Sequence, residues 1–226
     1  MRYSKTHEIP KRLYFLLFSL VAVLSAIVTS GCGCGCTPGT TPDYISARAP
    51  LVVGPGMAYS TPQEAVDACR DGDTILIMDG TYTFEKGIEL FEKNNIKIIG
   101  RDNVELVCTN MDDNVMWIVT CSNITIKNIK ARHTDPTKDE RCYGNVFAID
   151  TSRIITIENC DINGCGAIGV YSMGGSKIML RQNHIHNNSL WAVQHNGVGY
   201  LQAVDNMDDL YFEDNIIENN GPPTFL

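Results

Sequence analysis

The sequence predicts an all-β solenoid, in which the chain coils as a stack of short parallel strands, and three observations support this prediction. First, a three-residue unit with apolar residues at both ends recurs down the second half of the chain: Ile124–Ile126, Ile155–Ile157, Ile178–Leu180 and Leu210–Phe212. Second, an amide or acid follows two positions after each unit, and a small or apolar residue follows five positions after it. Third, the last residues of successive units are 31, 23 and 32 residues apart, a spacing typical of solenoid repeats. Each repeat should therefore add one rung, with apolar side chains inside and the outward side chains in columns.

The amino terminus predicts export from the cytosol. Four basic residues precede an apolar run from Leu13 to Val28, which is shorter than the roughly 20 residues of a membrane-spanning helix. Small residues and a cysteine follow, as at a secretory cleavage site. We therefore interpret residues 1–31 as a signal peptide.

The segment from Val28 to Cys32 resembles a bacterial lipobox, although Thr29 stands where that motif has Leu or Val. The resemblance implies cleavage before Cys32, lipidation of its sulfur, and a place in the bacterial cell envelope, at the outer membrane or the cell surface. An uncleaved anchor and an ordinary cleaved signal stay open as alternatives. Residues 32–51 then form the lipidated cysteine and a flexible linker, because they are rich in Gly, Thr and Pro without periodicity.

The charge of the chain excludes one class of partner. Removal of residues 1–31 takes away four of the 18 Lys and Arg and one of the 26 Asp and Glu, so the net charge changes from −8 to about −11. Such a chain does not attract nucleic-acid phosphates, and we expect no nucleic-acid partner.

Nine cysteines in an oxidising compartment invite disulfides, whose pairing the spacing does not reveal. Cys160 occupies an inward position of its repeat and is expected to be a small buried filler.

A short amphipathic helix opens the domain of residues 52–226. Thr61, Pro62 and Glu64 provide an N-cap, a proline in the first turn and a capping-box carboxylate. We expect the helix to end at Asp71–Gly72.

A strand over residues 73–78 follows the helix and is closed by a turn at Asp79–Gly80. The order of helix, the segment Asp71–Tyr82 (DGDTILIMDGTY) and short strands in series resembles the entry to the pectin-lyase-like right-handed parallel β-helix. The resemblance extends from about Val52 to the carboxyl terminus and implies a single-stranded coil whose amino-terminal end is capped by the helix. Such a cap has a physical reason, because an uncovered ladder end invites pairing with another chain.

Before most of the repeated units lies a second apolar segment, so each rung should contain at least two strands; these segments are Val146–Ile149, Ala167–Val170 and Leu190–Val193. Asn, Asp and Gly should occupy the corners between strands, since they tolerate left-handed backbone conformations. Two longer loops, Thr134–Gly144 and Asn196–Asp208, are places where binding surfaces are usually built.

The predicted coil is short. Alignment points counted from Ile77 through Ile98 to Phe212 give about six rungs, and residues 222–226 contain two prolines and no capping segment. We therefore expect either a truncated solenoid or a last rung that a partner covers, with self-association of the isolated domain through that rung.

Outward side chains should stack in columns about 4.8 Å apart from rung to rung. The first column alternates in sign: Lys127, Glu158, Arg181 and Glu213. We interpret it as a salt-bridge ladder on a solvated face. The alternative is a floor for an acidic sugar, on which Lys127 binds the substrate and Arg181 neutralises its carboxylate.

Two further columns carry candidate catalytic residues: Lys130, Asp161 and His184 in one, and Arg132, Asn163 and His186 in the other. Asp161 should neighbour His184, and a carboxylate that orients an imidazole is the arrangement a general base needs. Lys130 and Arg132 could neutralise a uronate carboxylate, and His186 could contact the substrate. The alternative is an ordinary solvated face, on which histidine and asparagine are common.

The pair of His184 and His186 could also supply half of a metal site. A third ligand is evident only if His195 or Asp161 comes close, so we assign no metal and leave the cofactor open. Tyr200, in a loop beside a glycine, is the best candidate for stacking on a sugar ring, because Trp191 should start a buried strand.

These observations lead to one main functional hypothesis and two alternatives. An exported β-helix is expected to bind or cleave acidic polysaccharide, with cleavage a β-elimination in which His184 or Lys130 is the base. Arg132 or Arg181 would then neutralise the uronate carboxylate. The first alternative is a non-catalytic solenoid that binds a glycan or serves as envelope structure, and the second is an accessory to periplasmic metal-centre assembly.

Overall fold

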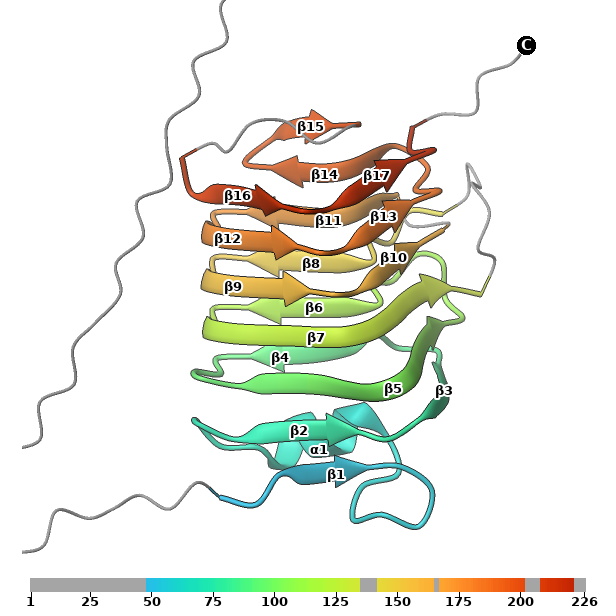
Figure 1. Cartoon of the computed structure of the whole chain (residues 1–226), viewed down its shortest axis with the longest axis vertical. Helices are drawn as coiled ribbons and strands as arrows, with labels where there is room; N and C mark the ends of the chain where they lie inside the picture. Colours follow the sequence, from blue (N-terminus) through green and yellow to red (C-terminus); the bar gives the residue numbers. More distant parts are fainter. Residues whose placement is uncertain (1–47, 135–141, 165–166, 202–207, 222–226) are drawn as a thin grey trace, which may run out of the picture. The chain divides into compact units, whose positions relative to one another are not determined.

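The computed structural model describes residues 48–134, 142–164, 167–201 and 208–221. These residues form a coil of parallel strands stacked in rungs (Figure 1), which confirms the predicted all-β parallel solenoid. The first sheet contains eleven described strands: β1 (Leu51–Val53), β2 (Thr74–Ile77), β3 (Gly80–Phe84), β5 (Lys97–Cys108), β7 (Ser122–His133), β9 (Arg153–Glu158), β10 (Asp161–Asn163), β12 (Ser176–Arg181), β13 (His184–His186), β16 (Leu210–Glu213) and β17 (Ile216–Glu218). The second sheet contains six described strands: β4 (Ile88–Phe91), β6 (Met116–Val119), β8 (Phe147–Asp150), β11 (Ile168–Met173), β14 (Trp191–His195) and β15 (Val198–Tyr200). The helix α1 spans Pro62–Ala68.

The strand register follows the repeat alignment of the sequence. Ile126 pairs with Ile157, Ile157 with Leu180, and Leu180 with Phe212. In the later rungs the chain continues beyond the unit into a second short strand, so that β9 is followed by β10 and β12 by β13 on the first sheet, whereas β7 runs through both segments without a break. The predicted second strands are also present, as β8, β11 and β14.

The register of the first rungs differs from the sequence alignment by two residues. Ile98 pairs with Ile75 and not with Ile77, so the alignment point taken for that rung was wrong. Both residues are buried. A shift by two keeps the same face inside, so the alternation in β2 could not distinguish the two registers. A further strand, β1, begins at Leu51 and pairs with β2 below the first expected rung.

The helix α1 caps the coil as predicted. The side chain of Thr61 accepts a hydrogen bond from the Glu64 backbone N–H at 3.3 Å, and the Glu64 carboxylate accepts one from the Thr61 N–H at 3.3 Å. Ala65 and Val66 are buried in the core, and α1 contacts β1, β2 and β4. The helix ends at Ala68, earlier than expected, because the backbone is already extended at the next residue.

The strands that the sequence did not predict include β3 and β15. The expected turn at Asp79–Gly80 leads directly into β3, which pairs with the second half of β5; Thr and aromatic residues alternate there, as strand formers do. The other is β15, which lies in the expected loop after β14 and folds back antiparallel on it. Both pairings join β-forming residues to a neighbouring strand that the repeat pattern does not specify.

The corners of the coil are built by residues with left-handed backbone, as predicted. At the bend after each repeated unit φ lies between 51° and 59°, at Asn128, Asn159, Gln182 and Asp214. The corner after the next short strand has the same geometry at Gly164, Asn187 and Asn219. Asn and Gly adopt this conformation at little cost, so the bend recurs at the same place in each rung.

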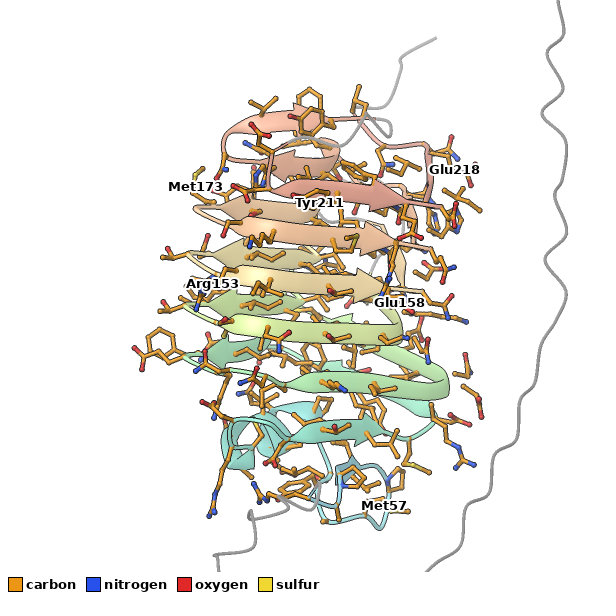
Figure 2. All side chains as sticks on the ribbon, turned by 60° about the vertical axis from the view of Figure 1, so that its left-hand side comes forward. Met57, Arg153, Glu158, Met173, Tyr211 and Glu218 are labelled. Atoms are coloured by element: carbon orange, nitrogen blue, oxygen red, sulfur yellow. The ribbon has the colours of Figure 1, made fainter. Side chains whose placement is uncertain are left out.

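The interior of the coil is a stack of aliphatic side chains. Ile98, Ile126, Ile157 and Leu180 lie one above the other and are no more than 1% exposed. Burial of each such side chain stabilises the fold by about 1.5–3 kcal/mol. Figure 2 shows side chains filling the space between the two sheets, while others such as Arg153 and Glu158 project outward.

Asparagine side chains extend the backbone hydrogen bonding at the bends of the upper rungs. Cys160 is buried, as predicted, and Asn183 and Asn215 occupy the same position in the next two rungs. The Asn183 amide donates to the Ile157 carbonyl at 2.9 Å and accepts from the Cys160 N–H at 3.0 Å. Its amide also donates to Asn215 Oδ1 at 3.1 Å. These amides therefore satisfy backbone groups that the bend leaves without ladder partners.

Two further observations concern the helices and the cysteines of the described residues. Among the described residues, no helix has the length and apolarity needed to cross a membrane. Cys69, Cys108, Cys121 and Cys160 are buried free thiols, so the disulfides that the cysteine count invited do not involve them. The signal peptide of residues 1–31, Cys32 and the linker up to residue 47 lie outside the described residues.

Candidate functional site

A groove of about 490 Å³ runs along the bend of the first sheet, and we call it the corner groove. Its floor includes the left-handed residues Asn128 and Asn159 and the buried Cys160. Its other charged and polar lining residues are Arg101, Asp102, Lys130, Asp161, Gln182 and His184. Three of these are candidates from the sequence, and the repeated bend brings them to one surface.

The strand register brings Lys130, Asp161 and His184 together in a column. Lys130 on β7 pairs with Asp161 on β10, which pairs with His184 on β13. The prediction that Asp161 neighbours His184 is therefore confirmed, whereas its catalytic role stays a prediction. The Lys130 ammonium donates to Asn103 Oδ1 at 3.2 Å and forms no ion pair with any carboxylate in the described part of the chain.

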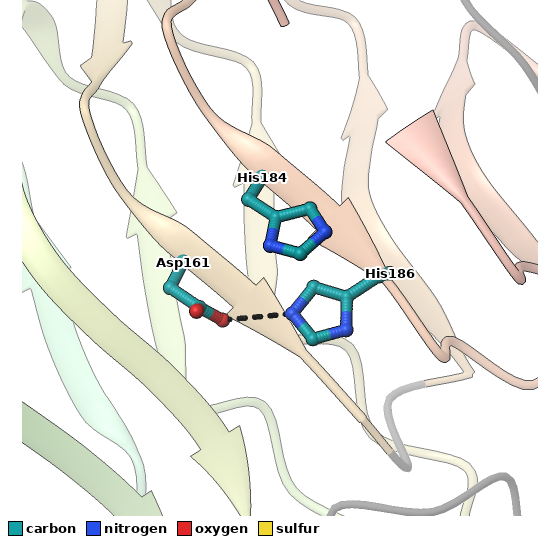
Figure 3. Close-up of side chains that lie close together, drawn as sticks. All are labelled: Asp161, His184 and His186. Atoms are coloured by element: carbon teal, nitrogen blue, oxygen red, sulfur yellow. Dashed lines mark hydrogen bonds and ion pairs between the residues drawn. The ribbon is translucent and has the colours of Figure 1, made fainter. Parts of the chain in front are cut away.

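The hydrogen bond of Asp161 goes to His186 and not to His184. Asp161 Oδ1 lies 3.1 Å from His186 Nε2 (Figure 3), and His184 Nε2 lies 2.9 Å from Glu218 Oε1. Strand side chains lean along the strand, so a carboxylate can reach the diagonal neighbour in the next rung. The two imidazole rings stack with centroids 3.8 Å apart and an interplanar angle of 19°.

The environment of Asp161 favours its ionised form. Burial is the largest single influence and raises the pKa of this carboxyl. The hydrogen bond from His186 and the positive charges nearby outweigh it, so that the pKa of Asp161 lies below its ordinary value. The carboxylate is therefore available to orient an imidazole or to accept a cation.

Three of the four residues in the column of alternating charges form ion pairs, as the salt-ladder interpretation predicts, whereas Glu213 forms none with the described residues. Glu158 accepts from Lys127 at 2.6 Å and from the Arg181 guanidinium at 2.9 Å. The hydrogen bond from Lys127 and the charges of both cations hold the pKa of Glu158 below its ordinary value, although burial opposes this. Lys127 and Arg181, candidates for substrate contact and carboxylate neutralisation, thus already hold a carboxylate.

Arg132 is also committed to protein partners. Its Nε donates to Glu105 Oε1 at 2.7 Å, and one terminal nitrogen donates to the carbonyls of His133 and Thr134, each at 2.9 Å. A smaller depression of about 310 Å³ lies between Glu105, Arg132 and Asp161. Arg132 is therefore near the candidate column, but its guanidinium carries three hydrogen bonds within the described structure.

The aromatic candidates belong to the second sheet. Tyr200 lies in β15, pairs with Val193 and packs against the core, so it is not part of the corner groove. Gly199 lies directly over the Trp191 ring, because a Cβ at this glycine would come within 2.5 Å of it. His195 and Asp161 were the two residues considered as a third metal ligand. His195 is buried in β14 on the second sheet, whereas Asp161 lies close to His184 and His186.

Several site residues were missed by the sequence analysis. Glu218 follows Ile217 in the last rung and stands in register with His186, so the repeat alignment contained the signal for it. Arg101 and Asp102 had no such signal, because they lie where the pairing of β5 with β7 shifts between Ile99 and Val104. Residues inserted into a strand have no counterpart in the repeat.

Two pectin methylesterase structures are similar to the structure of this chain. The structure is similar to a pectin methylesterase solved in complex with a hexasaccharide, with a TM-score of 0.46 and 11% identity over 74% of this chain and 67% of that chain. It is also similar to the pectin methylesterase of Aspergillus niger, with a TM-score of 0.30 and 13% identity over 75% and 87% of the two chains.

Among curated proteins, the chain is similar to SHC SH2 domain-binding protein 1 of Mus musculus, with 26% identity over 144 residues, 57% of this chain and 22% of that protein. The homolog B of Xenopus laevis is 26% identical over 187 residues, 72% of this chain and 25% of that protein. The chain thus spans about a quarter or less of the length of these relatives.

The chain also matches a family model. The model of the right-handed β-helix region matches residues 83–225. This match covers more than half of the chain, and the described strands within it pair in parallel, apart from the antiparallel β15. The chain therefore belongs to the right-handed β-helix family.

Proposed function

We propose that this protein is an exported β-helix that binds acidic polysaccharide in the corner groove. The observation that carries the proposal is Lys130: its ammonium lines the groove and has only an amide oxygen as partner among the described residues. A uronate carboxylate would give this ammonium a direct ion pair, in addition to the longer-range charges of Glu105 and Asp161.

Other features of the groove support the same ligand class. Its volume of about 490 Å³ falls within the range of small-molecule sites, and its lining is rich in hydrogen-bonding groups. Arg101 meets Asp102 at 3.7 Å, with the two side chains 56% and 81% exposed. Such an exposed pair contributes little, so Arg101 can turn toward a bound anion.

Binding is better supported than cleavage. A β-elimination needs a base beside the substrate and a second group that neutralises the uronate carboxylate. His184 lines the groove as a base candidate, but the neutralisers Arg132 and Arg181 hold Glu105 and Glu158. Cleavage would require one of these arginines to exchange its carboxylate for that of the substrate, or Lys130 to neutralise the uronate while His184 acts as the base.

Export is part of the proposal and rests on the sequence. A basic start, a short apolar run and the lipobox-like segment before Cys32 would place the domain at the bacterial cell surface, where acidic glycans are accessible. The proposed partners are therefore an acidic glycan and, through the lipid anchor, the membrane.

The experiment is a binding titration of the purified chain with polygalacturonate and alginate. Lys130→Gln should weaken binding at least tenfold, equivalent to about 1.4 kcal/mol, because it removes the charge that meets the uronate. Lys97→Gln is the matched control, since Lys97 is an exposed lysine of β5 outside the groove and should bind like the wild type. Binding of equal strength by all three proteins would contradict the proposal.

The same samples test cleavage. New ultraviolet absorbance from unsaturated uronate ends would indicate β-elimination, and its loss in His184→Ala and Arg132→Ala would identify the base and the neutraliser. Binding without new absorbance supports the non-catalytic role.

A further inference from the structure

Asp161, His184 and His186 form a cluster with the composition of a metal site. One ligand atom from each residue lies within 4.8 Å of those of the other two. We propose that these three side chains bind a divalent transition-metal ion of the zinc class. This proposal does not depend on glycan binding, because it concerns only the metal and these three residues.

The fold itself places the two imidazoles on one surface. His184 and His186 are separated by one residue on β13, so both rings leave the same face of the strand, and the buried Ile185 lies between them on the other face. Asp161 on β10 is the register partner of His184 in the adjacent rung. The three ligands therefore come from two hydrogen-bonded strands, whose separation is fixed by the ladder.

The distances are close to those of a metal complex. Tetrahedral zinc with bonds of about 2.0–2.2 Å separates neighbouring ligand atoms by roughly 3.3 Å. Asp161 Oδ1 and His186 Nε2 are already 3.1 Å apart. His184 therefore has to approach by about 1.5 Å at most, which a rotation of its ring can provide. The three side chains are between 12% and 36% exposed, which leaves a route for the ion.

The hydrogen-bond partners of the imidazole nitrogens that face away from the cluster support the same assignment. Glu218 Oε1 lies 2.9 Å from His184 Nε2, and Figure 3 shows the other nitrogen of that ring facing Asp161. When a carboxylate accepts a hydrogen bond from the N–H of one imidazole nitrogen, the second nitrogen is unprotonated and can bind a metal. The amide of Asn187 lies 3.0 Å from His186 Nδ1, and with its oxygen turned inward it would do the same for His186.

The charges also fit a dication. Asp161 and Glu218 bring two carboxylates to the two imidazoles, one from the rung on either side of β13. Imidazole and carboxylate together are ligands that zinc and related ions prefer. Two separate pairs, His186 with Asp161 and His184 with Glu218, are the competing explanation of the same contacts, and they make no use of a metal.

Imidazole NMR of the full chain with added Zn²⁺ separates these explanations. The readout has to be at the histidines, because the cysteine thiols near the amino terminus also bind zinc. The chain has five histidines. Added zinc should change the ¹⁵N chemical shifts of Nδ1 of His184 and Nε2 of His186 in one saturable step. The shifts of His133 and His195 should stay unchanged. Unchanged shifts at both cluster histidines with zinc in millimolar excess would overturn the proposal.

Substitution of the third ligand provides the second arm. Asp161→Asn keeps the shape of the side chain but removes its charge, and it should weaken the histidine-detected affinity at least tenfold. Glu213→Gln is the matched control, since it removes an exposed carboxylate of the neighbouring column and should leave the affinity unchanged. Equal affinities of the wild type and Asp161→Asn would exclude the three-residue site even if the histidines respond to zinc.

Discussion

The role of a residue in this coil depends on the residues in the rung above and the rung below. Cys160 is surrounded by protein, and burial raises the pKa of its thiol to about 12, so it is an unreactive filler. Asn183, one rung further, has the same inward direction but hydrogen-bonds three neighbours. The side chain at a given repeat position can therefore change from apolar to polar wherever the backbone of the bend provides partners.

Glu158 provides a prediction for pH dependence. Its pKa is lowered from an ordinary value of 4.5, first by the hydrogen bond from Lys127, so its ionised form stabilises the fold. This contribution is fully present above about pH 5 and is lost as the pH falls through the lowered pKa of the folded state. In urea titrations, Glu158→Gln should be less stable than the wild type at pH 7 by about 1 kcal/mol.

The difference between wild type and Glu158→Gln should shrink steadily below the ordinary pKa. Glu85→Gln is the control, because Glu85 is exposed and lies outside the column. A difference that stays constant down to strongly acidic pH would show that the loss comes from packing and not from the charge.

At the scale of the strands, two devices repeat in each rung. Alternation within the unit sends Ile155 and Ile157 into the core and leaves Thr156 on the outer face of β9. A left-handed residue then turns the chain, so the next short strand starts at a new angle. This bend is what opens the corner groove between neighbouring rungs.

The inward and outward faces of β9 can be tested with one pair of variants. Ile157→Asp places a charge in the interior and should reduce the free energy of unfolding by several kcal/mol. Thr156→Asp places it on the outer face and should cost no more than about 1 kcal/mol. Denaturant melts that give similar losses for the two variants would mean that the register is wrong.

At the scale of the molecule, coiling converts sequence repeats into a continuous surface. Residues 23 to 34 positions apart, such as Asp161 with His184 or His184 with Glu218, become direct neighbours. Figure 2 shows Glu158 and Glu218 toward the same edge of the coil, several rungs above the residues near its base such as Met57. A ligand longer than one sugar can thus contact several rungs at once.

The predicted lipid anchor is tested on the whole chain expressed in a bacterial host. If Cys32 is lipidated, Cys32→Ala should abolish incorporation of radiolabelled fatty acid and move the protein out of the detergent phase. Cys34→Ala, two residues further, should keep the label. Label that persists in Cys32→Ala would rule out this cysteine as the attachment site.

Period-2 alternation and the recurring amide were sufficient to predict the rungs, the inward faces, the left-handed corners and the columns, because each is a local property of the chain. The same repeat alignment was enough to predict that Lys130, Asp161 and His184 share one column. The hydrogen bond between Asp161 and His186, the pairing of His184 with Glu218 and the walls of the corner groove depended on the tertiary structure. Side chains that lean along a strand choose among diagonal neighbours, and the shift between Ile99 and Val104 places Arg101 and Asp102 where no repeat predicts them.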